Sequence, residues 1–596
     1  MKFSFRFPAT QASEGTRAIR RRSLLLAVVL IAVLPLAWRG PSCGQDFDFH
    51  LQSWLDVARS WHEGVLYPHW AASANYLAGE PRFVFYPPLS WLMGAALGFI
   101  LPWTWTLLAF TLLALLGAGF AFRAMAREWA GDDHAALAAC LYVLNPYMMF
   151  VAYERGALAE LLAAIWVPLL VLYALRRANA LVPLTLVVAA LWLTNAPAAV
   201  MGCYMLAVVV AVAALRERSW KLAVRSLCAV PLGLGLAGFW LIPAIYEQRW
   251  VQIDKAIGPL MRVEDSFLFG YAKLADYPNS SDERFQVNYH NQVLHTASWI
   301  VVALMAAFVL AAWLSRRRKS GVWLPLVVAG GVICALQFRW SDLIWLWTPK
   351  LAFVQFPWRW MLVLALISAA LAGLALRPQP PTRRMIAVRA LALLLLAGAT
   401  AAYSSKLFWQ YCDEDDNVQA QLATRGAAGF EGTDEYTLEG VELGAAEDLN
   451  GDNGPAPAVA VVSAPHAGEP DADQEAGKPI PARVRIVRWR TEHMTAIVTC
   501  PQAGFAVLRL MDYPAWSVTR NGARANGLVR RSDGTMAIPV EAGENRIDVR
   551  WHTSPDQWAG IALSLAALAI ILACVLARRR QQLGVAPEGV AGAPLS

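Results

Sequence analysis

The chain is dominated by apolar runs that are long enough to cross a lipid bilayer. A membrane-spanning helix needs about 20 predominantly apolar residues. Of the 596 residues 57% are hydrophobic and 16% charged, which is too apolar for a soluble protein of this size. The runs lie at about 23–38, 104–122, 135–152, 157–175, 180–195, 197–215, 222–246, 296–314, 322–338, 356–376, 386–403 and 557–577. The sequence therefore predicts a mainly α-helical, polytopic membrane protein.

Basic clusters between the runs predict its orientation, because cytoplasmic loops of membrane proteins are enriched in Lys and Arg. The first run follows the basic residues 20–22 and lacks a small-x-small cleavage motif, so we expect an uncleaved helix after a cytoplasmic segment 1–22. If segment 89–101 crosses only partly, the later clusters also face the cytoplasm: Arg123 and Arg127, Arg176 and Arg177, 216–225, 316–319, 377–389 and 578–580. We expect about 12 spans plus one partial segment in the inner membrane, and a cytoplasmic tail 578–596.

This topology places loops 39–88 and 247–295 and the region 404–556 outside the cytoplasm, with the helical bundle occupying 23–403. The region 404–556 ends in segments such as ARVRIVRWR and FAVLRL, separated by turn signals. Their alternation predicts a small antiparallel, sandwich-like β domain before the last span at 557–577. The Ala-, Gly-, Pro- and Asp-rich stretch 443–480 is typical of a flexible linker. Cys412 and Cys500 could pair there if the compartment is oxidising.

The segment GQDFDFHLQSW (44–54) places two carboxylates and a histidine just beyond the first span. Apolar residues at helical spacing from Phe47 predict an amphipathic helix over 47–62 that lies along the membrane surface. In the simplest explanation Asp46 is the N-cap of this helix, and Asp48 is a solvated carboxylate in the first turn that suits the helix dipole. His50 would then lie on the exposed polar face of the helix. Asp46 and His50 are nevertheless four residues apart, so they share one helix face.

Three further motifs carry charge at the same predicted side of the bilayer. GEPRFVFYPPLSW (79–91) combines Arg82 with aromatic residues, among them Tyr86. VAYERGALAELL (151–162) and FVQFPWRWMLVL (353–364) stand at the outer ends of spans, and they contain Glu154, Arg155 and Glu160, and Arg359, respectively. The simpler explanations are that Glu154 and Arg155 form a charge pair at the surface, that Glu160 snorkels, and that Arg359 is an interfacial anchor. Ionisable residues at membrane depth are costly and usually functional, and an arginine can bind phosphate bidentately.

Motifs for nucleotide or hydrolase chemistry are missing from the sequence. It has no GKS or GKT phosphate loop, no GxSxG and no HExxH. The net charge of +7 comes from the short clusters between spans, so no nucleic-acid partner is expected. Any chemistry outside the membrane must therefore draw its energy from the substrate, and a membrane-bound activated donor such as a polyprenyl-phosphate sugar meets that requirement.

The motifs GQDFDFHL, PHW, GEPRFVFYPPLSW, YERGALAELL and FPWRW resemble the bacterial integral membrane proteins labelled 6-pyruvoyl-tetrahydropterin-synthase-related. The loop–helix arrangement resembles the wider C-type glycosyltransferase (GT-C) superfamily. The stretch DYPAWSVTRNGARANGL, followed by VEAGENRIDVRW and a last span, resembles the end of related proteins implicated in cell-wall glycosylation. The resemblance covers most of the chain and is weakest at 404–480.

This resemblance implies a glycosyltransferase that moves a sugar from a polyprenyl-phosphate donor to an extracytoplasmic acceptor, with inversion. Asp46 would be the general base, with Asp48 as second choice and Glu154 completing an acid pair. A divalent metal, Mg or Mn, held by Asp46, Asp48 and Glu154 is the other role for these carboxylates. The substrate-binding residues would be His50, Arg82, Tyr86, Arg155, Glu160 and Arg359, with membrane lipids around the prenyl chain.

Two other functions are compatible with the same motifs. A transporter or lipid-carrier binding protein would need charged residues continuing through the bundle, whereas here they gather at the outer ends. An assembly subunit would use the region 404–556 to bind glycan or protein partners, and would tolerate alanine at Asp46, His50 and Glu154. A fold can host several functions, so these alternatives are separated by the site and not by the fold.

Overall fold

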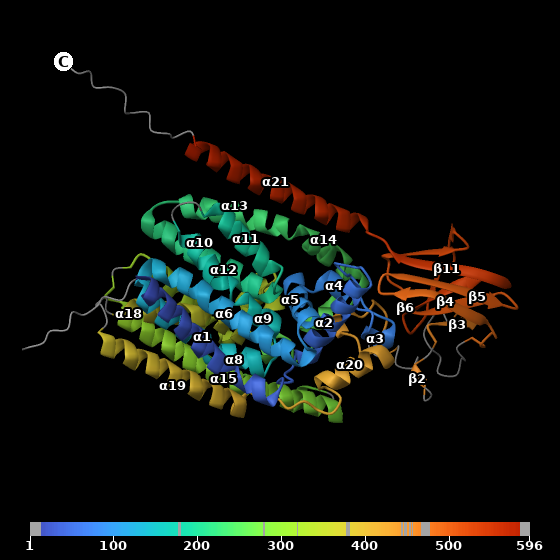
Figure 1. Ribbon diagram of the computed structural model, residues 1–596, viewed down its shortest axis with the longest axis horizontal. Helices are drawn as coiled ribbons and strands as arrows, with labels where there is room; N and C mark the ends of the chain where they lie inside the picture. Colours follow the sequence, from blue (N-terminus) through green and yellow to red (C-terminus); the bar gives the residue numbers. More distant parts are fainter. Residues whose placement is uncertain are drawn as a thin grey trace, which may run out of the picture.

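The computed structural model shows a helical bundle with a β domain at one end (Figure 1). The structure describes residues 14–176, 180–277, 280–318, 320–376, 382–442, 445, 450–451, 454–455, 457–465 and 477–583. The chain runs through the bundle, enters the β domain and returns along the bundle as a last helix.

The longer helices alternate with short ones that interrupt the predicted spans. In chain order the α-helices are α1 (Glu14–Arg39), α2 (Phe47–His62), α3 (Ala74–Leu77), α4 (Arg82–Phe85), α5 (Pro88–Ile100), α6 (Trp103–Ala130), α7 (Asp132–Val143), α8 (Pro146–Tyr153), α9 (Leu158–Ala163), α10 (Trp166–Leu175), α11 (Leu181–Trp192), α12 (Ala196–Glu217), α13 (Lys221–Leu236), α14 (Gly238–Glu247), α15 (Ser281–Ser315), α16 (Trp323–Ala335), α17 (Asp342–Trp347), α18 (Met361–Ala375), α19 (Arg383–Leu407), α20 (Val418–Ala427) and α21 (Pro555–Leu583).

Short 3₁₀ turns connect several of these helices. They are η1 (Gln248–Trp250), η2 (Ile253–Ile257), η3 (Val263–Asp265), η4 (Leu274–Asp276), η5 (Arg339–Ser341), η6 (Leu351–Val354), η7 (Pro357–Trp360) and η8 (Asp434–Tyr436).

Each predicted span coincides with a helix or a bent pair of helices. Among the described residues, eight helices are long and apolar enough to cross a membrane, and up to eleven spans result if each bent pair counts as one. The bent pairs are α7 with α8 (42°), α13 with the helix after it (74°) and α16 with the helix after it (101°). The mainly α-helical membrane fold is therefore confirmed, while the number of full crossings stays a prediction.

Two apolar helices are too short to span alone. α5 has 13 residues and α11 has 12, which at 1.5 Å per residue is about 20 Å against a hydrocarbon core of about 30 Å. α5 is the ambiguous segment 89–101, and proline stands at its start. It packs closely on α2, because a Cβ at Gly94 would lie 2.0 Å from the indole of Trp54. This packing places α5 directly beneath the first loop.

The β domain is a two-sheet sandwich, as the alternating segments predict. One sheet has the order β3-β6-β10-β9 and the other β4-β5-β11-β7-β8. The strands are β1 (Asn450–Gly451), β2 (Gly454–Pro455), β3 (Val459–Val462), β4 (Arg483–Arg490), β5 (His493–Cys500), β6 (Gly504–Met511), β7 (Trp516–Arg520), β8 (Ala523–Arg524), β9 (Val529–Arg530), β10 (Thr535–Val540) and β11 (Gly543–Trp551). Inward side chains of both sheets, such as Val498 and Leu508, share one apolar core.

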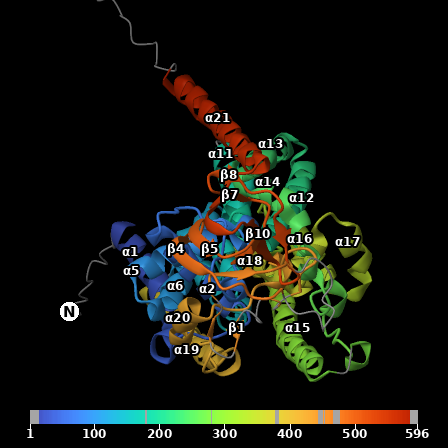
Figure 2. The ribbon, with the colours of Figure 1, turned by 90° about the vertical axis from the view of Figure 1, so that its right-hand side faces the viewer.

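The predicted linker 443–480 is partly ordered. It contains β3, which pairs antiparallel with β6; residues 443–444, 446–449, 452–453, 456 and 466–476 lie outside the described residues. Viewed from the β-domain end, the strands lie in front of α2 and α20 and leave α15 and α17 to one side (Figure 2). The β domain therefore stands over the first loop.

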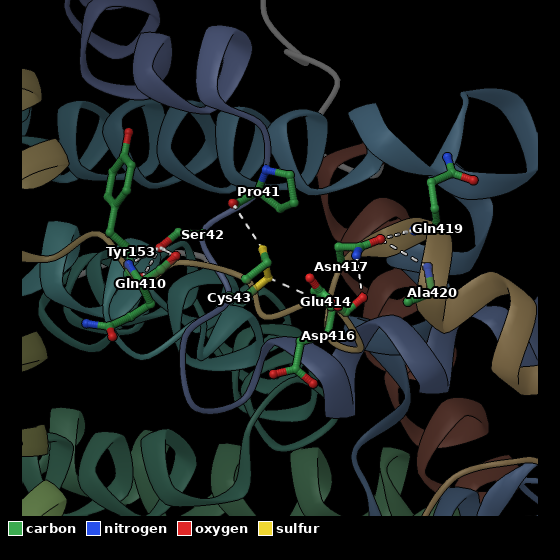
Figure 3. Close-up of a disulfide and its surroundings, with 11 residues drawn as sticks. Pro41, Ser42, Cys43, Tyr153, Gln410, Glu414, Asp416, Asn417, Gln419 and Ala420 are labelled. Atoms are coloured by element: carbon green, nitrogen blue, oxygen red, sulfur yellow. Dashed lines mark hydrogen bonds between the residues drawn. A yellow bond between two sulfur atoms is a disulfide. The ribbon is translucent and has the colours of Figure 1, made fainter.

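The expected Cys412–Cys500 pairing is wrong. Cys412 forms a disulfide with Cys43, 369 positions earlier in the chain, and Cys500 is a buried free thiol. Ser42 aligns the two segments: its hydroxyl donates to the carbonyl of Tyr153 (2.7 Å) and accepts from the backbone N–H of Gln410 (2.9 Å; Figure 3). The pair was missed because sequence pattern does not encode the contact between the first loop and the segment after α19.

Breaking this cross-link should destabilise the protein. We expect a Cys43→Ser/Cys412→Ser variant to lose about 2–4 kcal/mol of stability, because a disulfide restricts the unfolded chain. Thermal unfolding of the purified protein measures the loss, and Cys228→Ser, which replaces an exposed free thiol, is the control. Peptide mapping without reductant should link Cys43 to Cys412, and a Cys412–Cys500 peptide would contradict the structure.

Candidate functional site

The site is built where the start of α2 meets the turn between α8 and α9. The backbone N–H of Asp46 donates to the carbonyl of Arg155 (2.8 Å), and that of Gln45 donates to the carbonyl of Glu154 (3.4 Å). Gly44 permits this approach, because a Cβ there would lie 2.3 Å from the Glu154 carbonyl oxygen. The GQD and ERG motifs, about 110 residues apart in sequence, therefore form one backbone-paired unit.

The side chain of Asp46 does not cap the helix. Asp46 occupies the N-cap position of α2, but its side chain makes no capping hydrogen bond. The carboxylate is 41% exposed and lies 3.7 Å from the guanidinium of Arg155. The simple capping explanation is wrong for this side chain, which leaves a carboxylate open to solvent beside a buried cation.

Arg155 and Arg359 share the buried carboxylate of Glu160. Nη1 of Arg155 lies 2.7 Å from Oε2 of Glu160, and Nε of Arg359 lies 3.6 Å from the same oxygen. The hydroxyl of Tyr147 donates to the other oxygen. Two guanidinium groups thus face one fully engaged carboxylate, so the cluster has surplus positive charge. Glu160 is only 3% exposed, so it does not snorkel to the membrane surface.

Aromatic rings hold the two arginines in place. The Arg155 guanidinium lies over the ring of Trp358 (4.9 Å), and that of Arg359 over the ring of Phe356 (5.0 Å). The buried Nε atoms of both arginines have no hydrogen-bond partner among the described residues. FPWRW therefore supplies a charge and its aromatic walls to the same cluster as YERGALAE.

Glu154 is buried beside this cluster and is not part of a surface charge pair. It is 3% exposed, and its Oε2 has no partner within the described part of the chain. Burial raises the pKa of Glu154 to about 8, against the opposing influence of Arg155. Glu154 thus holds a proton at neutral pH.

His50 connects α2 to α9. It is 1% exposed, and its Nε2 accepts from the backbone N–H of Leu158 (3.1 Å). Burial lowers the pKa of His50 to about 4, so the ring stays neutral and keeps its acceptor. The expected exposed polar face is wrong for His50, and the contact makes it a positioning residue for the adjacent Asp46.

Asp48 and Arg82 belong to a neighbouring cluster. Arg82 pairs with Glu80 (2.6 Å), and both side chains are about 1% exposed. It also donates to the hydroxyls of Ser53 and Thr433 (both 3.0 Å). Burial and the nearby negative charge of Asp46 raise the pKa of Asp48. Arg82 therefore connects the first loop to the segment after α20.

Tyr86 forms a wall between the two clusters. Its ring packs edge-on against Phe49 (4.8 Å) and His50 (6.0 Å). Burial, together with the negative charge of Asp46, raises the pKa of the Tyr86 phenol, while Arg359 acts in the opposite direction. Tyr86 thus lies within electrostatic range of both the exposed carboxylate and the arginine pair.

Sequence reasoning missed three residues of this region. Tyr147 holds Glu160. Tyr289 of α15 interacts with Gln45 and lies within electrostatic range of Glu154 and Asp46. Glu435 of η8 lies near Arg82 and Tyr86, and burial raises its pKa to about 7. Tyr147 lies in α8, next to the YERG motif, and could have been predicted as a site residue from that position. Tyr289 and Glu435 lie outside the charged motifs that mark the site in the sequence.

The predicted metal set is not assembled. No group of three or more His, Cys, Asp or Glu side chains suited to a metal occurs among the described residues. Asp46 faces Arg155, Glu154 is buried with a raised pKa, and Asp48 belongs to the Arg82 side. Arginine side chains therefore supply the positive charge at this site.

These features describe a polytopic membrane protein with a charged site at the β-domain end of its bundle. The chain belongs to the 6-pyruvoyl-tetrahydropterin synthase related membrane protein family, whose model matches residues 83–409. No curated protein matches the chain.

The solved structures that match the chain have low sequence identity to it. Arabinofuranosyltransferase AftD from Mycobacteria is 16% identical, with a TM-score of 0.38 over 68% of this chain and 28% of AftD. ArnT from Cupriavidus metallidurans bound to undecaprenyl phosphate is 14% identical, with a TM-score of 0.39 over 70% of this chain and 69% of ArnT. The oligosaccharyltransferase AglB from Archaeoglobus fulgidus, in complex with an inhibitory peptide and a dolichol-phosphate, is 15% identical, with a TM-score of 0.39 over 67% of this chain and 57% of AglB. At these values the chemistry must be argued from this chain's own residues.

Glu154 should make stability depend on pH. Its pKa is raised in the folded state, so the folded protein binds an extra proton between about pH 4.5 and 8. Stability therefore falls as the pH rises through that window, by about 1.4 kcal/mol for each pH unit crossed. Glu154→Gln, which mimics the protonated acid, should weaken this fall; equal pH dependence of the melting temperature in both proteins would contradict the assignment.

Proposed function

We propose that this protein is a membrane glycosyltransferase that transfers a sugar from a polyprenyl-phosphate donor to an acceptor outside the cytoplasm. The observation that carries the proposal is the exposed Asp46 carboxylate held 3.7 Å from Arg155, which shares the Glu160 carboxylate with Arg359. The Asp46 carboxylate can accept a proton, and the guanidinium groups of Arg155 and Arg359 can stabilise an anion a few ångströms away.

The arginine pair suits the phosphate of a lipid-linked sugar. Guanidinium groups remain charged and bind phosphate oxygens in a planar, bidentate way. The side chains of Arg155 and Arg359 are only 2% and 11% exposed and are held by aromatic rings, so their charge acts in a medium of low polarity. Their single shared carboxylate leaves positive charge available for a phosphate at the end of the bundle.

Asp46 is the candidate general base. The acceptor hydroxyl attacks the anomeric carbon of the sugar and gives its proton to Asp46. The bond between that carbon and the phosphate oxygen breaks in the same displacement, which inverts the anomeric centre. The leaving phosphate takes the electron pair, and Arg155 and Arg359 stabilise its developing negative charge. A base needs only hydrogen-bond reach and a suitable protonation state, and the exposure of Asp46 supplies access.

Other residues support this arrangement without reacting. His50 anchors the first turn of α2 to α9, and the Gly44 region pairs with the turn after α8. Tyr86 lies within electrostatic range of Asp46 and of both arginines, and Glu154 lies within electrostatic range of Arg155. Prenyl chains and membrane lipids would surround the apolar helices next to the site.

Two features support an extracytoplasmic site. Cys43, three residues before Asp46, forms the disulfide with Cys412, and disulfides persist mainly in oxidising compartments. The basic clusters favour the opposite end of the spans as cytoplasmic. Both support a topology with the N-terminus and the C-terminal tail in the cytoplasm of an inner-membrane protein.

The general-base assignment is tested with a matched pair of variants. Asp46→Asn should reduce transfer by about 10²–10⁴-fold, the usual contribution of a general base. Asp48→Asn, two positions along the same helix turn, should retain most of the activity. The assay follows labelled sugar from synthetic polyprenyl-phosphate donors into acceptor material in membranes containing equal amounts of each protein.

Two outcomes would contradict this function. An Asp46→Asn protein with full transfer would remove Asp46 as the base. If alanine at Asp46, His50 and Glu154 leaves envelope glycosylation intact while deletions in the β domain abolish it, the protein is an assembly subunit instead.

The phosphate-binding role gives a separate prediction. Arg359→Gln leaves the closer Arg155–Glu160 pair balanced, so the protein should still fold. Loss of one charged hydrogen bond of about 1.5–3 kcal/mol should raise KM for the donor about 10- to 100-fold. Arg249→Gln, which changes an exposed arginine outside the cluster, is the control. An unchanged donor KM in Arg359→Gln would contradict phosphate binding by this residue.

A further inference from the structure

The outer face of the five-stranded sheet is unusually basic. In this sheet the alternate residues of β5, Met494, Ala496, Val498 and Cys500, point into the apolar core. Because side chains alternate along a strand, His493, Thr495, Ile497 and Thr499 point outward. Every residue directly opposite these four on a neighbouring strand shares the outer face.

The register places seven arginines on this face. On β4, Arg483, Arg485, Arg488 and Arg490 stand opposite Thr499, Ile497, Thr495 and His493, respectively. A bulge between Ile486 and Arg488 shifts the register, so that all four arginines stay on the outer side. β11 and β8 add Arg546, Arg550 and Arg524 through the same pairing. All seven side chains are exposed; together they are called the arginine face.

Acidic side chains on this face do not balance the arginines. By register the outward acids of these strands are Glu544 and Asp548, which leaves a surplus of five positive charges. Asp548 is already engaged: it accepts from Thr495 (2.7 Å), contacts His493 (3.0 Å) and pairs with Arg550 (2.7 Å). The arginine face is therefore a strong anion-attracting surface.

Protection of a sheet edge does not explain this pattern. Edge strands often carry charges that prevent pairing with other chains, and β4 is an edge strand. However, Arg546 and Arg550 lie on β11, the central strand of the sheet. Arginines in the middle of the face have no edge to protect, so a ligand is the better explanation.

The face extends away from the helical bundle. β11 ends at Trp551, and α21 begins at Pro555, so Arg550 is the row nearest the bundle (Figure 1). From Arg490 to Arg483 the row of arginines on β4 rises by about 23 Å at 3.3 Å per residue. A flat lipid surface cannot touch all rows of such a face, whereas an extended chain can.

The lower end of the face leads to a cavity above α2. Arg490 donates to the carbonyl of Glu63, at the end of α2 (3.2 Å). Around the edge of β4 lies a cavity of about 120 Å³, which Arg490 lines together with the inward-facing Trp489 and Met494 and with Arg59, Trp70 and Arg509 among others. Arginines bind carboxylate or phosphate groups, and tryptophans offer flat apolar surfaces, a combination suited to a sugar that carries negative charge.

We propose that the arginine face binds an anionic glycan, a polysaccharide with repeated carboxylate or phosphate groups, along β4 and toward the cavity. The surplus charge, the length of the row and its direction away from the bundle all match an extended anionic chain. Binding of the glycan does not depend on catalysis. The further step, in which the bound glycan is the acceptor delivered to Asp46, rests on the proposed transferase function.

The test measures binding of polygalacturonate to the full-length protein in detergent. We expect wild type to bind polygalacturonate but not neutral dextran, with affinity falling as salt increases. Arg485→Gln/Arg546→Gln should weaken binding at least tenfold. Arg262→Gln/Lys478→Gln removes the same charge at exposed positions outside the face and should bind as wild type. The melting temperatures establish that all variants are folded, and a single Arg485→Gln change serves if the double variant is unstable.

Three results would overturn the proposal. Equal binding by the two double variants would show that net charge alone attracts the polymer. Equal binding of dextran would remove the requirement for anionic groups. If the arginine-face variant loses binding to phosphatidylglycerol vesicles but not to polygalacturonate, the surface binds lipid. Asp46→Asn should bind polygalacturonate normally, which separates this proposal from the fate of the transferase.

Discussion

The buried carboxylate of Glu160 is the interaction on which the site depends. It lies between Arg155 and Arg359 and accepts from Tyr147, so residues of three different segments meet at one side chain. Removing one partner of a buried ion pair leaves an uncompensated charge, which costs about 3–5 kcal/mol. The cluster is nevertheless not neutral, because two guanidinium groups share one carboxylate. By formal charge this surplus is balanced by the exposed carboxylate of Asp46, which lies 3.7 Å from Arg155.

A second set of contacts places the β domain over this cluster. The Cys43–Cys412 disulfide joins the segment before Asp46 to the segment after α19. The buried Arg82–Glu80 pair contacts Thr433, just before η8. Trp70 of the first loop packs against Tyr513 and Trp516 of the β domain (5.9 and 5.1 Å). These contacts make the first loop a shared element of bundle and β domain, so an acceptor held by one would be presented to the other.

Much of the site could be predicted because its residues interrupt apolar patterns. A charge beside a membrane span is costly, so Asp46, Arg155, Glu160 and Arg359 stand out against their surroundings. Their partners do not: Tyr289 falls in the predicted loop 247–295, whose last part the structure shows as the start of α15, and Glu435 lies in the 3₁₀ turn η8 outside the bundle. The predicted Cys412–Cys500 pairing was wrong for the same reason. Cys500 lies in the same region of the sequence as Cys412, but Cys43 is the cysteine next to Cys412 in space.

By itself the sequence determined the elements: the apolar runs, the helix over Phe47–His62, the alternating strands and the charged motifs at span ends. These follow from local periodicity and from the energetic cost of charge near lipid. The tertiary structure decided which of these charges meet. It buried Glu154 and His50, left Asp46 exposed beside Arg155, and used the register of β4, β5 and β11 to gather arginines on one face. Such choices depend on backbone approach at Gly44, on a disulfide between distant segments and on strand register, which arise only when the whole chain is packed.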